Sequence, residues 1–154
     1  EDSIEISAEP TKEGAEDYKR LMQWEEVQEQ KLGELGIKIQ QQVQEAMTTK
    51  AIPAGLEDNI KQYKASLEEV NKSLENLSID DPEIKALAAK KRELYSFSGE
   101  GLLLSVNVMT SEDQSPEFIQ KFEKQIGELS NKVNQLNTHI GKAEAALDKK
   151  YPRQ

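Results

Sequence analysis

The stretch of sequence that decides the fold is residues 119–147, IQKFEKQIGELSNKVNQLNTHIGKAEAAL. Its apolar residues recur at alternating spacings of three and four, which is the pattern of a helix that buries one narrow seam. Most residues between them are charged or polar, as a solvated helix face requires. We therefore predict a long amphipathic helix whose seam consists of Ile119, Phe122, Ile126, Leu129, Val133, Leu136, Ile140, Ala143 and Leu147.

Helix start and stop signals bound this stretch on both sides. Ser115 and Pro116 supply an N-cap and a proline at the first helical position, where the missing N–H is tolerated. The lysines at 149–150 lie where positive charge suits the helix dipole, and Pro152 prevents continuation. The helix is therefore predicted over 116–150.

Three further helices are predicted upstream from the same kind of evidence. One contains an unbroken seam of seven apolar residues, and another follows an N-cap aspartate and a proline. The first of the three is longer and less regular, because two glycines interrupt its stripe. We predict these helices over 12–50, 56–78 and 82–110, joined by short turns that favour antiparallel neighbours.

The segment 102–109, LLLSVNVM, leaves two alternatives open. In the first, the helix continues through it, and the small residues Ser98, Gly99 and Gly101 allow a kink or a close crossing. In the second, the helix ends near Phe97 and the segment is extended. We favour the helix, because a lone strand would leave its backbone groups without partners. Such a helix is apolar on more than one face, so we expect it to be deeply buried or to form a contact surface.

Together these segments predict an all-α fold, an elongated antiparallel four-helix bundle over 12–151 with coiled-coil-like heptad packing, since each seam is too narrow to be buried alone. Residues 1–11 have no helical period and are predicted to form an acidic disordered segment. Of the net charge of −9, −6 comes from residues 1–17, which carry seven acids and one lysine. The remaining 22 acids and 19 bases leave the rest nearly balanced at −3.

The composition also bears on location and on classes of partner. The chain begins at Glu1 without an initiator methionine, contains no cysteine and opens with a spacer-like acidic run. We therefore expect an extracytoplasmic protein (periplasmic, envelope-anchored or secreted) from which a signal peptide, a lipidated cysteine or another domain has been removed. The negative charge argues against nucleic acid as a partner. No run approaches the roughly 20 apolar residues that direct membrane insertion needs.

Few residues offer catalytic or cofactor chemistry. Without cysteine there is no thiolate nucleophile or thiolate metal ligand, and His139 is the only histidine. Neither a glycine-rich phosphate loop nor a serine nucleophile elbow is present. We therefore predict no enzyme, no metal site and no resident cofactor. The one cofactor alternative is a small haem carrier, with His139 and one of Met22, Met47 and Met109 as axial ligands.

The leading hypothesis is a non-enzymatic interaction or structural module of a bacterial cell-envelope or secreted protein, which presents a helical face to a protein partner. Its main alternative is a coiled-coil segment excised from a larger secreted translocator or adaptor protein; self-association is left open. The glutamine-rich run at 40–44 is either a polar helix face or a helix contact surface. Because large aromatic and apolar residues commonly anchor partners, the candidate partner-binding residues are Trp24, Phe97, Leu103, Leu104 and Val108.

Overall fold

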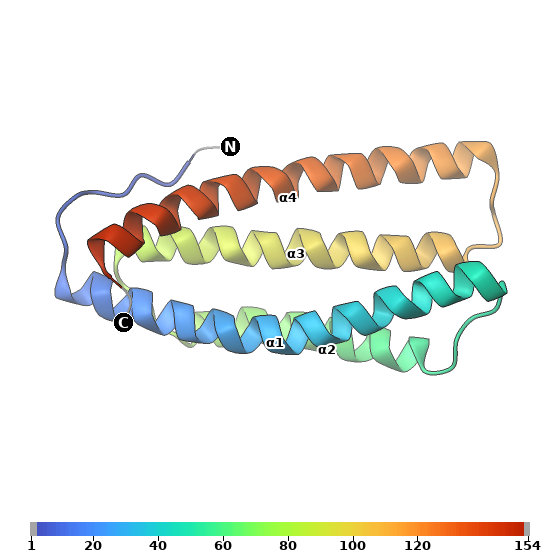
Figure 1. The fold of residues 1–154 in the computed structure, drawn as a ribbon, viewed down its shortest axis with the longest axis horizontal. Coiled ribbons are helices and arrows are strands. Elements are labelled where there is room, and N and C mark those ends of the chain that lie inside the picture. The colour runs from blue at the N-terminus through green and yellow to red at the C-terminus, as the bar shows by residue number, and fades with distance from the viewer. Residues whose placement is uncertain (1–2, 153–154) are drawn as a thin grey trace.

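Four helices account for most of residues 3–152, which are the residues that the computed structural model describes. Consecutive helices reverse direction at each connection, so the molecule is an elongated bundle (Figure 1). No strand occurs within residues 3–152, which confirms the predicted all-α four-helix class. In chain order the helices are α1 (Lys12–Thr49), α2 (Leu56–Glu75), α3 (Pro82–Thr110) and α4 (Pro116–Lys150).

Side chains immediately before three of the helices set where they begin. The Thr11 hydroxyl accepts a hydrogen bond from the Gly14 amide, 2.9 Å away, at the start of α1. The Asp81 carboxylate accepts from two amides in the first turn of α3, and the Ser115 hydroxyl accepts from the Phe118 amide at the start of α4. These bonds satisfy N–H groups that have no partner inside the helix.

α3 is the central helix of the bundle. Within the described chain it is the only helix whose backbone comes close to all three others. It runs without a break through 102–109, so the helical alternative for that segment is confirmed. A helix with neighbours on several sides can bury apolar residues on more than one face, which explains the unusual composition of this segment.

α2 ends three residues earlier than predicted, at Glu75 rather than at residue 78. Ser78 has a left-handed backbone with φ of 51°, which a continuing helix does not allow. The Arg20 guanidinium of α1 donates to the main-chain carbonyls of Leu77 and Ser78. The turn is therefore stabilised from α1, and this contact is not visible in the periodicity of α2.

The end of the bundle that holds the start of α1, the turn at 76–81 and the end of α4 is the proximal end. There the buried Asp17 carboxylate accepts hydrogen bonds from the amides of Asp80 and Asp81, 3.0 and 2.9 Å away, and pairs with Arg20. The hydroxyl of Tyr18, the next residue of α1, donates to Asp148 of α4 over 2.6 Å. These bonds join α1 to α4 and to the turn before α3.

A buried lysine joins three helices near the same end. The Lys91 ammonium of α3 pairs with Glu25 of α1 and with Glu144 of α4, the latter at 3.0 Å. Its side chain is only 4% exposed, so both carboxylates are needed to offset the cost of burying the charge.

The N-terminal segment lies against the proximal end in extended backbone. Its Ile4 and Ile6 contact the core, and the Ser7 amide donates to Glu83 of α3 over 2.6 Å. The Lys150 ammonium of α4 bonds both Glu83 and Ser7, at 2.6 and 3.0 Å. Of the predicted disordered segment 1–11, residues 1–2 lie outside the described residues. The disorder of this segment in solution stays a prediction.

Candidate partner-binding groove

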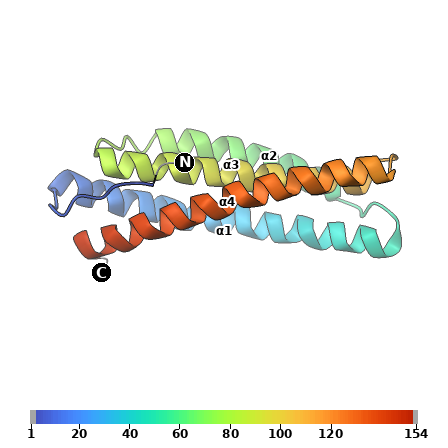
Figure 2. The same ribbon diagram turned by 90° about the horizontal axis from the view of Figure 1, so that it is seen from above.

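The seam of α4 changes its burial half-way along the helix. Its last four members, from Leu136 to Leu147, are buried, whereas its first five, from Ile119 to Val133, are only half-buried. Two perpendicular views show the cause: α4 follows α3 along its length but diverges from α1 away from the proximal end (Figures 1 and 2). The apolar seam of α4 therefore continues past the point where α1 covers it.

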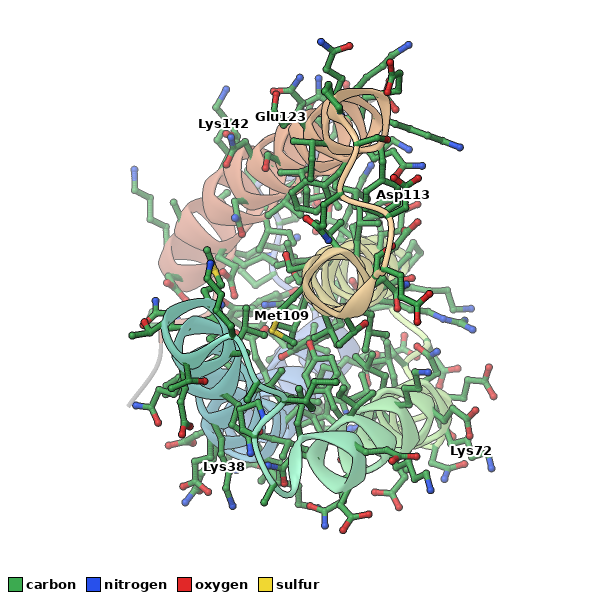
Figure 3. All side chains as sticks on the ribbon, turned by 90° about the vertical axis from the view of Figure 1, so that its right-hand side faces the viewer. Lys38, Lys72, Met109, Asp113, Glu123 and Lys142 are labelled. Carbon is green, nitrogen blue, oxygen red and sulfur yellow. The ribbon has the colours of Figure 1, made fainter. Side chains whose placement is uncertain are left out.

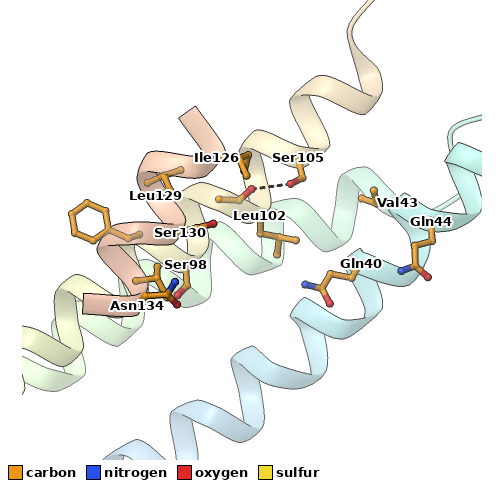
Figure 4. Close-up of a pocket in the computed structure, with 13 residues that line it drawn as sticks. Gln40, Val43, Gln44, Ser98, Leu102, Ser105, Ile126, Leu129, Ser130 and Asn134 are labelled. Carbon is orange, nitrogen blue, oxygen red and sulfur yellow. Dashed lines mark hydrogen bonds between the residues drawn. The ribbon is translucent and has the colours of Figure 1, made fainter. Parts of the chain in front are cut away.

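This divergence leaves an open groove of about 590 Å³ between α1 and α4, with α3 as its floor. Figure 4 shows the side chains of the three helices that line it. The lining residues span 97–105 of α3 and 126–134 of α4, so the groove is about 12 Å long, or roughly two helical turns. The lining comprises Gln40, Val43 and Gln44 of α1, Phe97, Ser98, Gly101, Leu102 and Ser105 of α3, and Ile126, Leu129, Ser130, Val133 and Asn134 of α4.

None of the 13 lining residues is charged, although charged residues make up 32% of the chain. The lining combines aliphatic side chains with amides and hydroxyls, and the Ser105 hydroxyl donates to the Gly101 carbonyl over 3.1 Å. Because no lining side chain ionises near neutral pH, the groove holds no general acid, general base or charged metal ligand. The groove is therefore suited to bind a surface that is itself uncharged and partly apolar.

Exposed apolar residues extend the α1 wall of the groove. Ile37 and Met47 are 58% and 64% exposed. With Gln40 and Gln44 they follow spacings of three, four and three, which place all four on one face of α1. In an end view of the molecule, Met109 at the end of α3 points between the helices, whereas the labelled lysines and acids lie on the outside (Figure 3). Ile37 and Met47 thus flank the two glutamines of the α1 wall on the same face of the helix.

The sequence profile of one family matches residues 15–152, which is nearly the whole bundle. The chain belongs to the family described as Uncharacterised lipoprotein PM1805. Membership of a lipoprotein family places the chain in the cell envelope, outside the cytoplasm, so the predicted extracytoplasmic location is confirmed. No curated protein and no solved structure matches the chain at a significant level.

The groove of this lipoprotein contains one of the predicted partner-binding residues and borders others. Phe97 lines it, and the Lys132 ammonium of α4 lies 5.0 Å from the centre of the Phe97 ring. Leu104 and Val108 are half-buried, and their spacing places them on the same side of α3 as Phe97. Leu103 is half-buried and packs against the core.

Trp24, the remaining predicted contact, lies in the core rather than at the groove. It is only 7% exposed, and its indole N–H donates to the Ser73 hydroxyl over 2.7 Å. Its ring meets Tyr95 edge-on, with 5.9 Å between ring centroids. A side chain with its polar atom bonded and its ring packed offers a partner little surface, so we leave Trp24 out of the proposed contact surface.

The α4 wall is the part of the groove that sequence reasoning missed. Ser130 and Asn134 belong to it, and neither stands out in a search for aromatic or apolar anchors. A usable signal is the scarcity of charge: residues 129–141 contain one formal charge, Lys132. An exposed helix face without charge is unusual in a protein of this composition.

The described residues offer little for metal or cofactor binding. Residues 3–152 contain no cluster of three or more metal-ligating side chains. His139 is half-buried on α4, and its Nδ1 has no hydrogen-bond partner. Neither His139 nor any of the three methionines lines the groove, so the groove lends no support to a haem carrier. None of the helices in this range has the length and apolarity to cross a bilayer.

Proposed function

We propose that this envelope lipoprotein is a non-enzymatic interaction module that presents the groove between α1, α3 and α4 to a protein partner. The observation that carries the proposal is the uncharged lining in a chain that is 32% charged. Covering charged side chains costs free energy unless each finds a partner, whereas covering this lining does not carry that cost. Removing the half-buried seam residues from Ile119 to Val133 from water also contributes favourable hydrophobic free energy to binding.

The arrangement of the bundle supports binding at this place. The N-terminal segment docks at the proximal end through Ser7, Glu83 and Lys150, and it leaves the groove uncovered. The proximal bonds hold α1, α3 and α4 in fixed relative positions, so the groove is formed before a partner arrives. A preformed site loses less conformational entropy on binding than one that must be ordered.

The same lining argues for binding rather than catalysis. Catalysis of acyl, phosphoryl or proton transfer needs a nucleophile, a base or a charged group at the reacting atoms. The groove offers serine hydroxyls and amides, but no ionisable side chain among its lining residues to activate them. We therefore assign it a role in recognition.

Photo-cross-linking in cells tests the proposal. A photoreactive amino acid is introduced at the exposed Ser98, in the groove, and as a matched control at Lys61, whose side chain is 72% exposed on α2. We expect protein adducts from Ser98 and none from Lys61, and we expect Phe97→Glu to abolish them. Equal adducts from both positions, or none from Ser98, would contradict a binding role for the groove.

A further inference from the structure

We infer that residues 3–10 form a releasable strap that sets where the start of the chain leaves the bundle. When docked, the strap turns back from the start of α1 and runs along the bundle, as Figures 1 and 2 show. When released, it is free to extend past the proximal end. The strap is separate from the groove, so the inference does not depend on the proposed function.

Two isoleucines attach the strap to the bundle. In extended backbone, side chains alternate between two faces, so Ile4 and Ile6 point the same way. Both are half-buried and pack against the core. The residues that alternate with them are exposed, namely Ser3, Glu5 and Ser7. The strap therefore has one apolar face on the bundle and one face in water.

An ion pair beneath the strap holds it in place. The Lys150 ammonium of α4 bonds the Glu83 carboxylate of α3 at 2.6 Å, and the two side chains are only 5% and 18% exposed. Both groups also bond Ser7, because Glu83 accepts from its amide over 2.6 Å and Lys150 donates to its hydroxyl over 3.0 Å. We call these three residues the latch.

Both ionisable groups of the latch are charged near neutral pH. Burial disfavours each charge, but the bonds of the latch outweigh it. They lower the pKa of Glu83 from its ordinary 4.5 and raise the pKa of Lys150 from its ordinary 10.5. Hydrogen bonds that involve a charged partner are stronger than neutral ones, so the latch is the firmest contact of the strap.

The strap joins α1 at a fixed point. The Thr11 amide donates to the hydroxyl of Tyr151, a buried residue just after α4, over 3.0 Å. A Cβ atom at Gly14 would lie 2.3 Å from that hydroxyl, so glycine at this position leaves room for the ring. We therefore expect release to move residues 3–10 about this point while Thr11 stays in place.

The rest of the strap is loosely held. Among residues 3–152, the strap backbone makes one hydrogen bond to the bundle, from the Ser7 amide. An open cleft of about 390 Å³ remains between residues 3–5 and the first turns of α3. Fixing this length of chain costs conformational entropy, and two half-buried isoleucines with one latch offset only part of a cost of that size. The docked and released states therefore differ little in free energy.

Release changes the position of the start of the chain. In the docked state, residues 3–5 lie beside 82–90 of α3, on the flank of the bundle. An extended strap reaches about 25–30 Å from Thr11, so residue 3 can move from the flank to well beyond the proximal end. The strap thus governs the separation between the bundle and any part of an envelope lipoprotein that lies upstream of it. The predicted disorder of this segment then describes the released state.

Distances between two spin labels on the full chain test the inference. The chain contains no cysteine, so Ser3→Cys and Lys61→Cys provide the only labelling sites, and both positions are exposed. We expect a main, narrow distance component from the docked strap and a minor, broad component at longer distance from the released strap. Circular dichroism verifies that each variant remains helical.

Two matched pairs of substitutions test how the strap is held. Ile6→Glu places a charge on the apolar face, and Ala8→Glu introduces the same residue at an exposed strap position. Lys150→Met removes the cation of the latch, and Lys149→Met removes its exposed neighbour. Ile6→Glu and Lys150→Met should each lower the ratio of docked to released strap about tenfold, and the two controls less than about twofold.

Two outcomes would overturn the inference. If the chain without these substitutions gives the same broad, long distances as Ile6→Glu, the strap does not dock. If both members of each pair give the same distances, Ile6 and the latch do not hold the strap. Ile6 lies outside the helices, so its variant remains informative even if Lys150→Met lowers the helicity. Neither outcome bears on the groove, which the Ser98 cross-link tests separately.

Discussion

The two halves of α4 carry the same heptad pattern and meet different surroundings. From Leu136 onward the seam is buried, and before Val133 the same spacing continues on a surface that remains half-open. The difference lies in α1, which is bonded to α4 at the proximal end and diverges from it further along (Figure 2). A heptad pattern therefore specifies which face of a helix is apolar, but it does not specify what covers that face.

Specific polar contacts lie beside the buried half of the α4 seam. Among the described residues, the hydrogen bond between α1 and α4 and the Lys91 ion pairs lie toward the proximal end. Such contacts require one arrangement of the helices, because a buried charge or donor without its partner is costly. In the groove half, the Asn59 amide of α2 donates to Gln42 of α1 over 2.9 Å, so α1 is bonded there to α2. This comparison can be tested at both ends of the molecule.

The largest effect is expected from Asp17→Ala at the proximal end. The substitution leaves two main-chain amides without an acceptor and Arg20 without its carboxylate. We expect the free energy of unfolding to fall by about 3–5 kcal/mol in urea titrations. Glu26→Ala, at an exposed position of the same helix, should change it by less than about 0.5 kcal/mol. Equal effects would show that the Asp17 network does not hold the proximal end together.

The second prediction compares two leucines of the same seam. Leu136 is fully buried and Leu129 is half-buried in the groove wall. Leu136→Ala should lower the free energy of unfolding by about 2–5 kcal/mol, and Leu129→Ala by no more than about half as much. The titrations should be carried out at low protein concentration, so that self-association does not add to the measured stability. A larger loss of stability in Leu129→Ala than in Leu136→Ala would mean that Leu129 is fully buried in solution and that the groove is closed.

The third prediction concerns the loss of folding stability at acidic pH. Burial raises the pKa of Asp17, but hydrogen bonds from the Asp81 amide and Arg20 outweigh it and lower the pKa from its ordinary 3.8. Burial likewise raises the pKa of Glu83, and bonds from Lys150 and Ser7 reverse the shift and lower it from 4.5. Both carboxylates therefore stabilise the fold fully above those values, and this stability is lost as the pH falls through the lower folded-state pKa values.

Urea midpoints measured from neutral pH down to about pH 3 check this expectation. The free energy of unfolding should decline below about pH 5, and Asp17→Asn should make the decline shallower, because its amide does not titrate. An unchanged slope in that variant would assign the acid sensitivity to other carboxylates.

The smallest effects are expected at two helical glycines. A Cβ at Gly33 of α1 meets nothing within 4 Å, so Gly33→Ala should raise the free energy of unfolding by about 0.5–1 kcal/mol. At Gly99 the new methyl group would come within 2.6 Å of the Leu67 side chain, which must move aside. Gly99→Ala should therefore gain less than Gly33→Ala, or lose stability. Equal gains in thermal unfolding would show that Leu67 yields without cost.

Much of the helical architecture was predictable from local signals. Pro82 and Pro116 stand at the first positions of α3 and α4, where their missing N–H groups cost nothing. α2 ends three residues before the predicted boundary, and the contact of Arg20 from a different helix with the Leu77 carbonyl leaves no trace in its periodicity. Phe97 was recognised as a contact candidate from its chemistry, while the burial of Trp24 depends on Ser73 and Tyr95, which lie far from it in the sequence.

The sequence by itself determined four helices and the apolar face of each, because spacing and capping act within a few residues of the chain. Only the tertiary structure decided that α3 is central, that Asp17 and Lys91 are buried, and that Ser130 and Asn134 line a groove. The physical reason is that burial depends on the angle at which whole helices cross. That angle is set by contacts between residues far apart in the sequence, such as Tyr18 and Asp148, which are 130 positions apart.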